Sequence, residues 1–188
     1  MDKPAHLKES RQRKFAYAII ALFCVSFVVG LSGAFFPNNS LPQIMVWQGA
    51  MTCMIAACVL MGAYVAERGW SFASGGFTLL GIACGSFYSS LAVDTFTPNI
   101  MARGIIILIP AFVSIGMSSY LPPILKWLSM SICIPFLILY IRILTGKYVV
   151  NEFLQMASFS YLQFNSVLWS VNVWRELKKR NDPFPQVP

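Results

Sequence analysis

Amide and hydroxyl side chains recur along one helical face of the last apolar segment of the chain. The residues at these steps of three or four are Gln155, Ser158, Leu162, Asn165, Trp169 and Asn172. Residues at such steps share one face of an α-helix. An amide in hydrocarbon is costly without a partner, so this face should point into the protein or into water. Uncharged amides and hydroxyls suit a small neutral or weakly charged solute better than a metal cation. Hydrogen bonding between helices is the alternative interpretation.

Small residues form a second helical face, in the segment "AERGWSFASGGFTLLGIACGSFYSS". They are Ser74, Thr78, Gly81, Gly85 and Ser89. Close approach of small residues is what associates helices in lipid, and Gly81 with Gly85 forms a GxxxG pattern. The face therefore predicts a packing surface at Gly81, Gly85 and Ser89, with hydroxyl groups along a solute path as the alternative. One turn apart in the preceding segment, Gln48 and Thr52 extend the set of polar side chains.

Residues typical of catalytic or metal sites are scarce. The single histidine, His6, lies in the polar N-terminal stretch, and the chain has no GxSxG, HExxH or glycine-rich phosphate loop. The carboxylates nearest the apolar segments, Glu67, Asp94 and Glu152, each lie near a predicted helix end. All five cysteines lie inside apolar segments without a CxxC pair, where a thiol behaves as a small hydrophobe. We expect no enzyme activity, no metal site and no cofactor.

The composition is that of a membrane protein. The chain is 57% hydrophobic and 11% charged, whereas soluble domains are roughly 25% charged. Crossing a bilayer takes about 20 apolar residues in a helix, and residues 15–66 contain no ionisable side chain. We therefore predict an all-α membrane protein with six transmembrane helices, separated by turn-forming stretches such as "FFPNNSLP", "ERGW", "YLPP" and "LTGK". The predicted helices are 15–36, 42–66, 71–93, 103–121, 124–144 and 148–174.

The basic residues predict the orientation of these helices. Five of the 14 lysines and arginines lie in the tail 1–14 and four in the tail 175–188, and basic loops stay on the cytoplasmic side. Both tails should therefore be cytoplasmic, flanking a six-helix transmembrane domain, 15–174, in a bacterial inner membrane. The charges flank apolar segments and form no basic face interleaved with aromatic residues. We thus expect contact with membrane lipid and none with nucleic acid.

Two pairs of segments indicate an internal repeat. "FVVGLSGAFFPNNSLP" in the first predicted helix is similar to "FVSIGMSSYLPP" in the fourth. "YVAERGWSF" at the end of the second is similar to "YIRILTGKYV" at the end of the fifth. A three-helix unit repeated once inserts in opposite orientations, so the pattern predicts an inverted 3+3 repeat.

The stretch "ERGWSFASGGFTLLG" resembles the junction of the second and third helices in acetate uptake transporters of the SatP (YaaH) type. The matching positions are Gly69, Ser71, Phe72, Phe77, Thr78 and Gly81. The resemblance implies six helices, cytoplasmic ends, a ring-shaped homo-oligomer and a pore for small monocarboxylates in each protomer. The family motif Asn-Pro-x-Pro-Leu-Gly is absent, since its place reads "RQRKFAYAII". The first helix, "ALFCVSFVVGLSGAFF", also looks like that of HdeD-type membrane proteins.

Together these patterns predict a channel or transporter for a small polar solute of the monocarboxylate or amide class. The candidate pore-lining residues are Gln48, Thr52, Phe72, Thr78, Gln155, Ser158, Asn165 and Trp169. A homo-oligomer or a membrane protein complex is the expected assembly. The alternative is a non-transporting membrane subunit, or an assembly-stabilising protein, that packs its helices against partner proteins.

Overall fold

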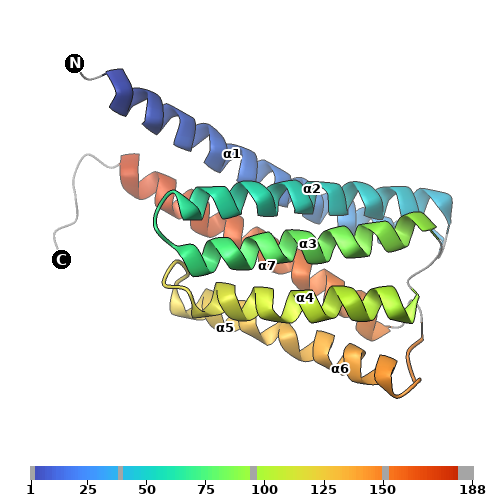
Figure 1. Cartoon of the computed structure of the whole chain (residues 1–188). Helices are drawn as coiled ribbons and strands as arrows, with labels where there is room; N and C mark the ends of the chain where they lie inside the picture. The colour runs from blue at the N-terminus through green and yellow to red at the C-terminus, as the bar shows by residue number, and fades with distance from the viewer. Residues whose placement is uncertain (1–2, 38–39, 94–96, 150–152, 182–188) are drawn as a thin grey trace.

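A computed structural model describes residues 3–37, 40–93, 97–149 and 153–181, which form helices and no strand (Figure 1). The helices are α1 Lys3–Ser32, the short 3-10 helix η1 Gly33–Phe35, α2 Leu41–Ala66, α3 Ser71–Val93, α4 Pro98–Met117, α5 Pro123–Ser131, α6 Cys133–Leu144 and α7 Phe153–Asn181. The predicted all-α fold is confirmed.

Four stretches are long and apolar enough to cross a membrane. They are Arg11–Phe35, Leu41–Ala66, Pro98–Met117 and Pro123–Leu144, the last combining α5 and α6. The chain is thus an integral membrane protein. Helix α7 is less apolar because amides and hydroxyls run along it, whereas α3 carries several glycines and serines among apolar residues.

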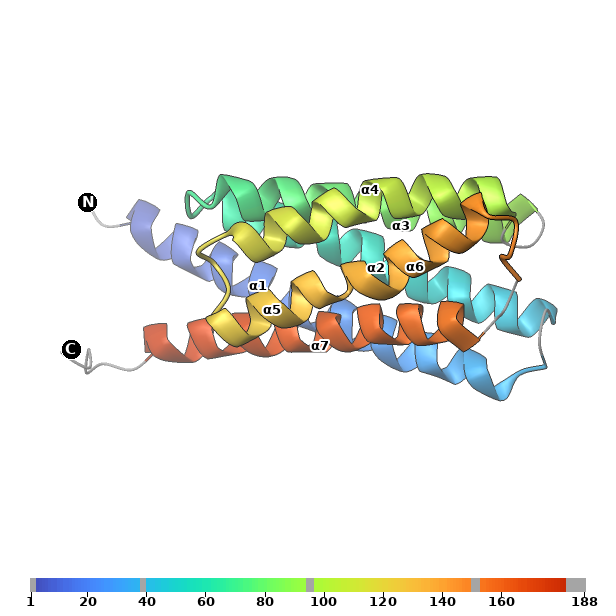
Figure 2. The same ribbon diagram turned by 90° about the horizontal axis from the view of Figure 1, so that it is seen from below.

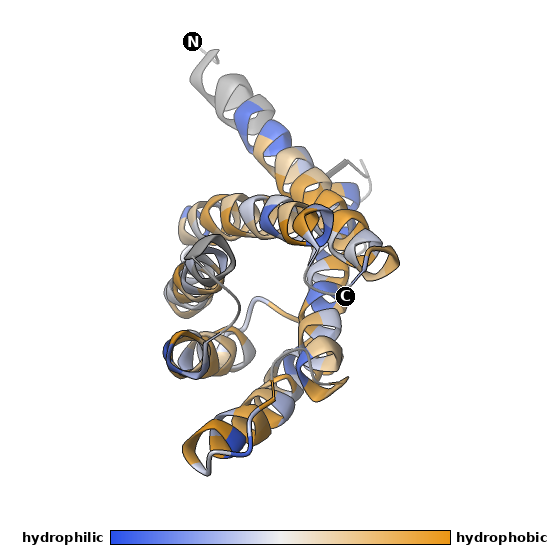
Figure 3. Cartoon of the chain, turned by 90° about the vertical axis from the view of Figure 1, so that its right-hand side faces the viewer, coloured by the Kyte–Doolittle hydropathy of each residue, from blue (hydrophilic) through white to orange (hydrophobic). Residues whose placement is uncertain are grey.

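The helices pack in a closed order around a shared core. Each of α1, α2, α3 and α4 packs against the next, α5 and α6 pack against α4, and α7 packs against both α6 and α1. Seen nearly along the helix axes, the helices surround a common centre (Figure 3). The largest fully buried side chains at this centre include Trp169, Phe23, Phe77 and Phe112. Helix α7 thereby completes the ring that the first four helices begin.

Both described chain ends lie at the same end of the bundle, next to the α2–α3 and α4–α5 connections (Figures 1 and 2). Helix α1 begins at Lys3 and α7 ends at Asn181. Much of each predicted tail is therefore helical and continues α1 or α7. Helix α4 lies about one turn before its predicted range 103–121 because Pro98 begins it and it ends at Met117.

Two of the predicted turns contain a glycine in the left-handed conformation. Gly69 has φ +81° and Gly146 has φ +68°, which favours glycine because it lacks a β-carbon. After α2, the Trp70 N–H donates to the Val65 carbonyl at 3.1 Å, and after α6 the Lys147 N–H donates to the Arg142 carbonyl at 2.8 Å. These bonds span five residues and close each helix end as a Schellman motif.

The predicted fifth helix, 124–144, is broken in the middle. Helix α5 ends at Ser131, Ile132 forms a turn, and α6 begins at Cys133. Pro135 lacks the N–H that would donate to the Ser131 carbonyl, and its ring would clash with that carbonyl in a continuous helix. Pro135 therefore accounts for one backbone hydrogen bond that is missing at this junction.

Candidate functional site in the helix ring

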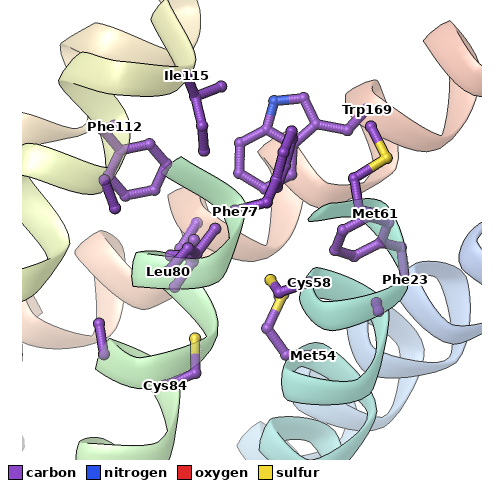
Figure 4. Packing of buried hydrophobic residues seen from close by; sticks show 14 of the residues in the cluster. Phe23, Met54, Cys58, Met61, Phe77, Leu80, Cys84, Phe112, Ile115 and Trp169 are labelled. Atoms are coloured by element: carbon purple, nitrogen blue, oxygen red, sulfur yellow. The ribbon is translucent and has the colours of Figure 1, made fainter. Parts of the chain in front are cut away.

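Trp169 of α7 lies at the centre of the ring and is fully buried. Its ring centroid is 5.8 Å from that of Phe23 in α1, 5.2 Å from Phe77 in α3 and 6.0 Å from Phe112 in α4. Figure 4 shows these rings together with Met61 of α2 and Ile115 of α4. One side chain thus joins α7 to helices on the far side of the ring, and aromatic rings fill the centre at this level.

A polar network links Trp169 to Asn165 through α5. The Trp169 Nε1–H donates to Ser129 Oγ at 3.0 Å, and the Ser129 hydroxyl donates to Asn165 Oδ1 at 3.5 Å. The Asn165 Nδ2 donates to the Tyr161 carbonyl, one turn back on α7, at 3.1 Å. A distance of 3.5 Å is long for a hydrogen bond. The Asn165 carbonyl oxygen is therefore weakly held and can accept a stronger donor.

The break between α5 and α6 lies beside this network. The hydroxyls of Ser131 and Tyr161 are 2.6 Å apart, and the Tyr161 hydroxyl also donates to the Leu128 carbonyl at 3.3 Å. Side chains of α7 thus hydrogen-bond to the last turn of α5, where the helical ladder stops. Ile132 keeps helical dihedral angles, φ −59° and ψ −30°, so the junction lacks ladder hydrogen bonds but is not unwound. Interrupted helices often form the sites of transporters.

A small crevice of about 100 Å³ opens between α1, α2 and α7, toward the bundle end away from the termini. Gln155 and Gln163 supply its amides, and Trp47 and Met51 line its opposite wall. The Gln155 Oε1 accepts from the Tyr148 hydroxyl at 2.9 Å, and the Gln163 Oε1 accepts from Ser26 Oγ at 3.2 Å. The crevice is mostly apolar, with two amides held in place at its edge.

The predicted pore-lining residues fall into two groups. Gln155, Ser158, Asn165 and Trp169 are all buried on α7, so the structure brings the predicted face of the last helix into the protein. On α2 and α3 the other four candidates are separate from this site. Gln48 is half-buried, whereas Thr52, Phe72 and Thr78 are exposed.

Three of the predicted residues, drawn from both sets, donate their hydroxyl hydrogen bond to a carbonyl of their own helix. Ser158 donates to the Leu154 carbonyl at 2.6 Å, Thr52 to the Gln48 carbonyl at 2.9 Å and Thr78 to the Ser74 carbonyl at 2.9 Å. These residues are thus stable without a partner on another helix. Asn165 is different because its amide joins two helices.

The predicted packing residues of α3 also differ in their surroundings. A β-carbon added at Gly81 would lie 3.5 Å from Cys58 Cβ of α2, whereas one at Gly85 would meet no atom within 4 Å. Ser89 is exposed, and its hydroxyl donates to the Ser86 carbonyl at 2.8 Å. Within one chain, Gly81 packs against α2, and Gly85 and Ser89 leave the outer side of α3 open.

Three buried polar residues that hydrogen-bond at the network or the crevice were absent from the predicted set: Ser26, Ser129 and Gln163. Ser26 donates to the Ala50 carbonyl at 2.8 Å and so ties α1 to α2 as well as to Gln163. A signal exists for each. Ser26 and Ser129 are hydroxyls inside apolar segments, and Gln163 is an amide within the apolar run of the last predicted helix.

No group of three or more His, Cys, Asp or Glu side chains that could hold a metal ion occurs among the described residues. No protein-family model, curated protein or solved structure matches this chain. The chemistry of the ring interior is thus that of neutral amide, hydroxyl and indole groups among aromatic rings.

Proposed function

We propose that the protein is a channel or transporter for a small polar solute of the monocarboxylate or amide class. In this proposal α3 and α7 complete six membrane crossings, arranged as an inverted repeat, with both termini on the cytoplasmic side of a bacterial inner membrane. A homo-oligomer in which each protomer has its own solute path is the proposed assembly.

The observation that carries the proposal is the position of Asn165. Its amide is fully buried in the ring, faces the interrupted span α5–α6, and has a carbonyl oxygen that is weakly held by Ser129 at 3.5 Å. A neutral donor and acceptor at the point where a helix breaks is the kind of site that binds a solute in transporters. Because Trp169 and its neighbouring rings fill the centre, passage of a solute requires the Trp169 side chain to move.

Flux measurements with Asn165→Leu test this proposal. Purified protein in proteoliposomes should carry acetate, urea or formamide faster than protein-free vesicles. Leucine has a similar volume and cannot form hydrogen bonds, so Asn165→Leu should reduce that flux at least about tenfold, the cost of one buried hydrogen bond in a site. Thr52→Val tests the other predicted pore-lining group. Thr52 is exposed and its hydroxyl bonds to its own helix, so flux should equal that of the unchanged protein if the path follows Asn165.

Two outcomes would count against the site. Normal flux in Asn165→Leu, combined with earlier melting, would make Asn165 a structural hydrogen-bonding residue. A loss of flux in Thr52→Val would place the solute path on the outer side of α2, where exposed Thr52 lies.

A non-transporting membrane subunit is the second candidate function. It is favoured by the aromatic rings that fill the ring centre (Figure 4), because a protein that only packs against partners needs no path. Isolation of the tagged chain from native membranes in mild detergent distinguishes the two. A partner protein recovered in constant stoichiometry, together with absent flux for all three solutes, would favour this candidate.

A further inference from the structure

A second pocket, of about 680 Å³, lies at the bundle end that holds the termini, between the α4–α5 connection and the last turns of α7. Four basic side chains line it: Lys126 of α5 and Arg175, Lys178 and Lys179 of α7. The acidic residue of its lining is Glu176. The lining therefore has a strong excess of positive charge.

Glu176 is already engaged by a fifth basic residue. Arg68, from the α2–α3 turn, pairs through Nη1 with Glu176 Oε2. The Arg68 side chain is 8% exposed, and its guanidinium carbon lies 3.7 Å from the centroid of the Tyr64 ring. Its Nε and Nη2 are buried and have no hydrogen-bond partner among the described residues. Arg68 pairs with Glu176, and the described part of the pocket lining holds no other acidic side chain for its four cations.

The base of the pocket presents polar groups with unused donors. Tyr120 is 4% exposed and Asn172 is 8% exposed, and both line the pocket. The Tyr120 hydroxyl and the Asn172 Nδ2 are buried without a hydrogen bond of good geometry in the described part of the chain. The two groups are neighbours, yet an amide has two N–H donors and a phenol has its own. At least one amide N–H and the phenol O–H thus remain for a ligand.

The surroundings of Tyr120 keep its hydroxyl protonated and in place. Burial raises the pKa of Tyr120, and the Glu176 carboxylate raises it further, so the phenol keeps its proton. The Trp70 ring packs on Tyr120 with centroids 4.7 Å apart and limits its movement. Helix α5 also begins at the pocket, at Pro123, with no side chain capping its first turn. The N-terminus of a helix favours an anion.

We propose that this pocket binds the phosphate group of an anionic ligand, supplied by a phospholipid headgroup of the adjacent leaflet or by a soluble phosphate ester. A phosphate carries two features that match the pocket: negative charge for the lysines and Arg175, and several acceptor oxygens for Tyr120 and Asn172. Basic pockets at the cytoplasmic ends of transmembrane helices bind such headgroups. The proposal does not rest on solute transport, since the pocket lining shares neither Asn165 nor Trp169, although Asn172 lies one helical turn after Trp169.

Native mass spectrometry of the full-length protein in detergent tests the site. The probes are phosphatidylglycerol, zwitterionic phosphatidylcholine and soluble glycerol phosphate. Lys126→Gln with Lys178→Gln removes two pocket charges, and Arg13→Gln with Lys14→Gln removes two exposed charges of α1 at the same bundle end. Asn172→Leu removes a donor at the base without changing the charge. Gel filtration and melting without ligand establish that each variant is folded.

We expect one phosphatidylglycerol to bind in preference to phosphatidylcholine. The pocket pair should weaken that binding at least about tenfold, Asn172→Leu should weaken it too, and the α1 pair should leave it unchanged.

Competition by glycerol phosphate would assign recognition to the phosphate alone. Binding of the lipid without such competition would show that the acyl chains contribute. Equal affinity for the two lipids combined with no binding of glycerol phosphate, or equal losses in the pocket pair and the α1 pair, would overturn the proposal. If Asn172→Leu does not fold, the two charge pairs decide.

Discussion

Helices α3 and α4 approach each other so closely at Gly76 that no side chain fits between them. A β-carbon added there would lie 2.8 Å from the Ala111 carbonyl oxygen and 2.9 Å from the Ile115 nitrogen, both backbone atoms of α4. Gly75, the adjacent residue, faces open space, with no atom within 4 Å of such a β-carbon. Close backbone contact through glycine is what holds helices together where lipid removes the hydrophobic drive.

Gly76→Ala should therefore destabilise the protein, and Gly75→Ala should not. Backbone atoms cannot move aside as a flexible side chain can, so we expect Gly76→Ala to cost about 1–3 kcal/mol of unfolding free energy. Gly75→Ala should be neutral or stabilise by up to about 1 kcal/mol, because alanine favours helix more than glycine does. Reversible unfolding in mixed micelles measures both. Equal stability of the two variants would mean that α3 and α4 separate more easily than this contact implies.

The pattern of small residues predicted a packing face on α3 and could not rank the glycines within it. Gly81 contacts α2, Gly76 contacts α4, and Gly85 contacts neither. A helix that carries small residues on all sides has several faces that permit close approach of a neighbouring helix. Which of them a neighbour uses depends on the path of the other helices, and the spacing of one segment does not contain that information.

At the scale of the helix, the break in the fifth span determines what α7 can reach. Because α5 ends at Ser131, the hydroxyl of Tyr161 can lie 3.3 Å from the Leu128 carbonyl and 2.6 Å from Ser131 Oγ. Pro110 provides a contrast, because α4 continues through it from Pro98 to Met117. A proline alone does not decide between a break and a continuous helix. Near Pro135, the Tyr161 hydroxyl of α7 supplies a hydrogen-bond partner for the Leu128 carbonyl in the last turn of α5.

Pro135→Ala should make the α5–α6 junction more helical. Alanine restores an N–H that can donate to the Ser131 carbonyl, so amide exchange over residues 131–136 should slow. The substitution also removes proline, which is about 3 kcal/mol less favourable than alanine in a helix interior. Pro110→Ala is the control, and it should leave exchange at the junction unchanged. Hydrogen exchange followed by mass spectrometry measures this, and exchange at 131–136 that stays as fast as before would show that contacts with α7, and not Pro135, set the break.

Composition and turn residues were sufficient to predict most of the elements. The turn around Gly69 and the start of α3 at Ser71 lie where the sequence predicted them, because charge beside glycine marks a helix end. The break at Ile132 was not predicted, since hydropathy counts side chains and takes no account of backbone hydrogen bonds. Helix α4 begins earlier than expected because Pro98 suits the first turn of a helix, whereas the prediction began only at Arg103.

At the scale of the whole molecule, the packing of the helices into a ring explains why the sequence predicted the α7 residues of the site but not their partners. Steps of three or four on α7 placed Gln155, Ser158, Asn165 and Trp169 on buried sides of that helix, because a costly amide seeks the interior. The partners of these residues come from distant segments. Ser129 lies 36 residues before Asn165 and 40 before Trp169. Contacts between residues so far apart in the sequence depend on how all the helices pack into the ring. No local sequence pattern specifies that packing.

The charge distribution of the whole molecule leads to a prediction about its orientation. The bundle end that holds the termini also holds Arg68 and Lys126, and the opposite end holds Arg103, Arg142 and Lys147. Nine of the 14 lysines and arginines lie in the two terminal stretches 1–14 and 175–188. Since basic segments stay on the cytoplasmic side, both termini should be cytoplasmic, and the α6–α7 connection should face the other side.

Cysteine labelling in intact cells tests this orientation. The five native cysteines are first replaced by alanine, and one cysteine is then introduced at Lys3, Lys147 or Gln186. An impermeant thiol reagent should label Lys147→Cys, because that exposed residue follows α6 at the far end of the bundle. Lys3→Cys and Gln186→Cys should react only after the membrane is permeabilised, which also confirms that their thiols are reactive.

Labelling of Lys3→Cys and Gln186→Cys from outside, with Lys147→Cys protected, would invert the topology and place the basic pocket of Lys126 and Lys178 in the outer leaflet. Labelling of only one terminus would mean an odd number of crossings, in which case either α3 or α7 would not span the membrane.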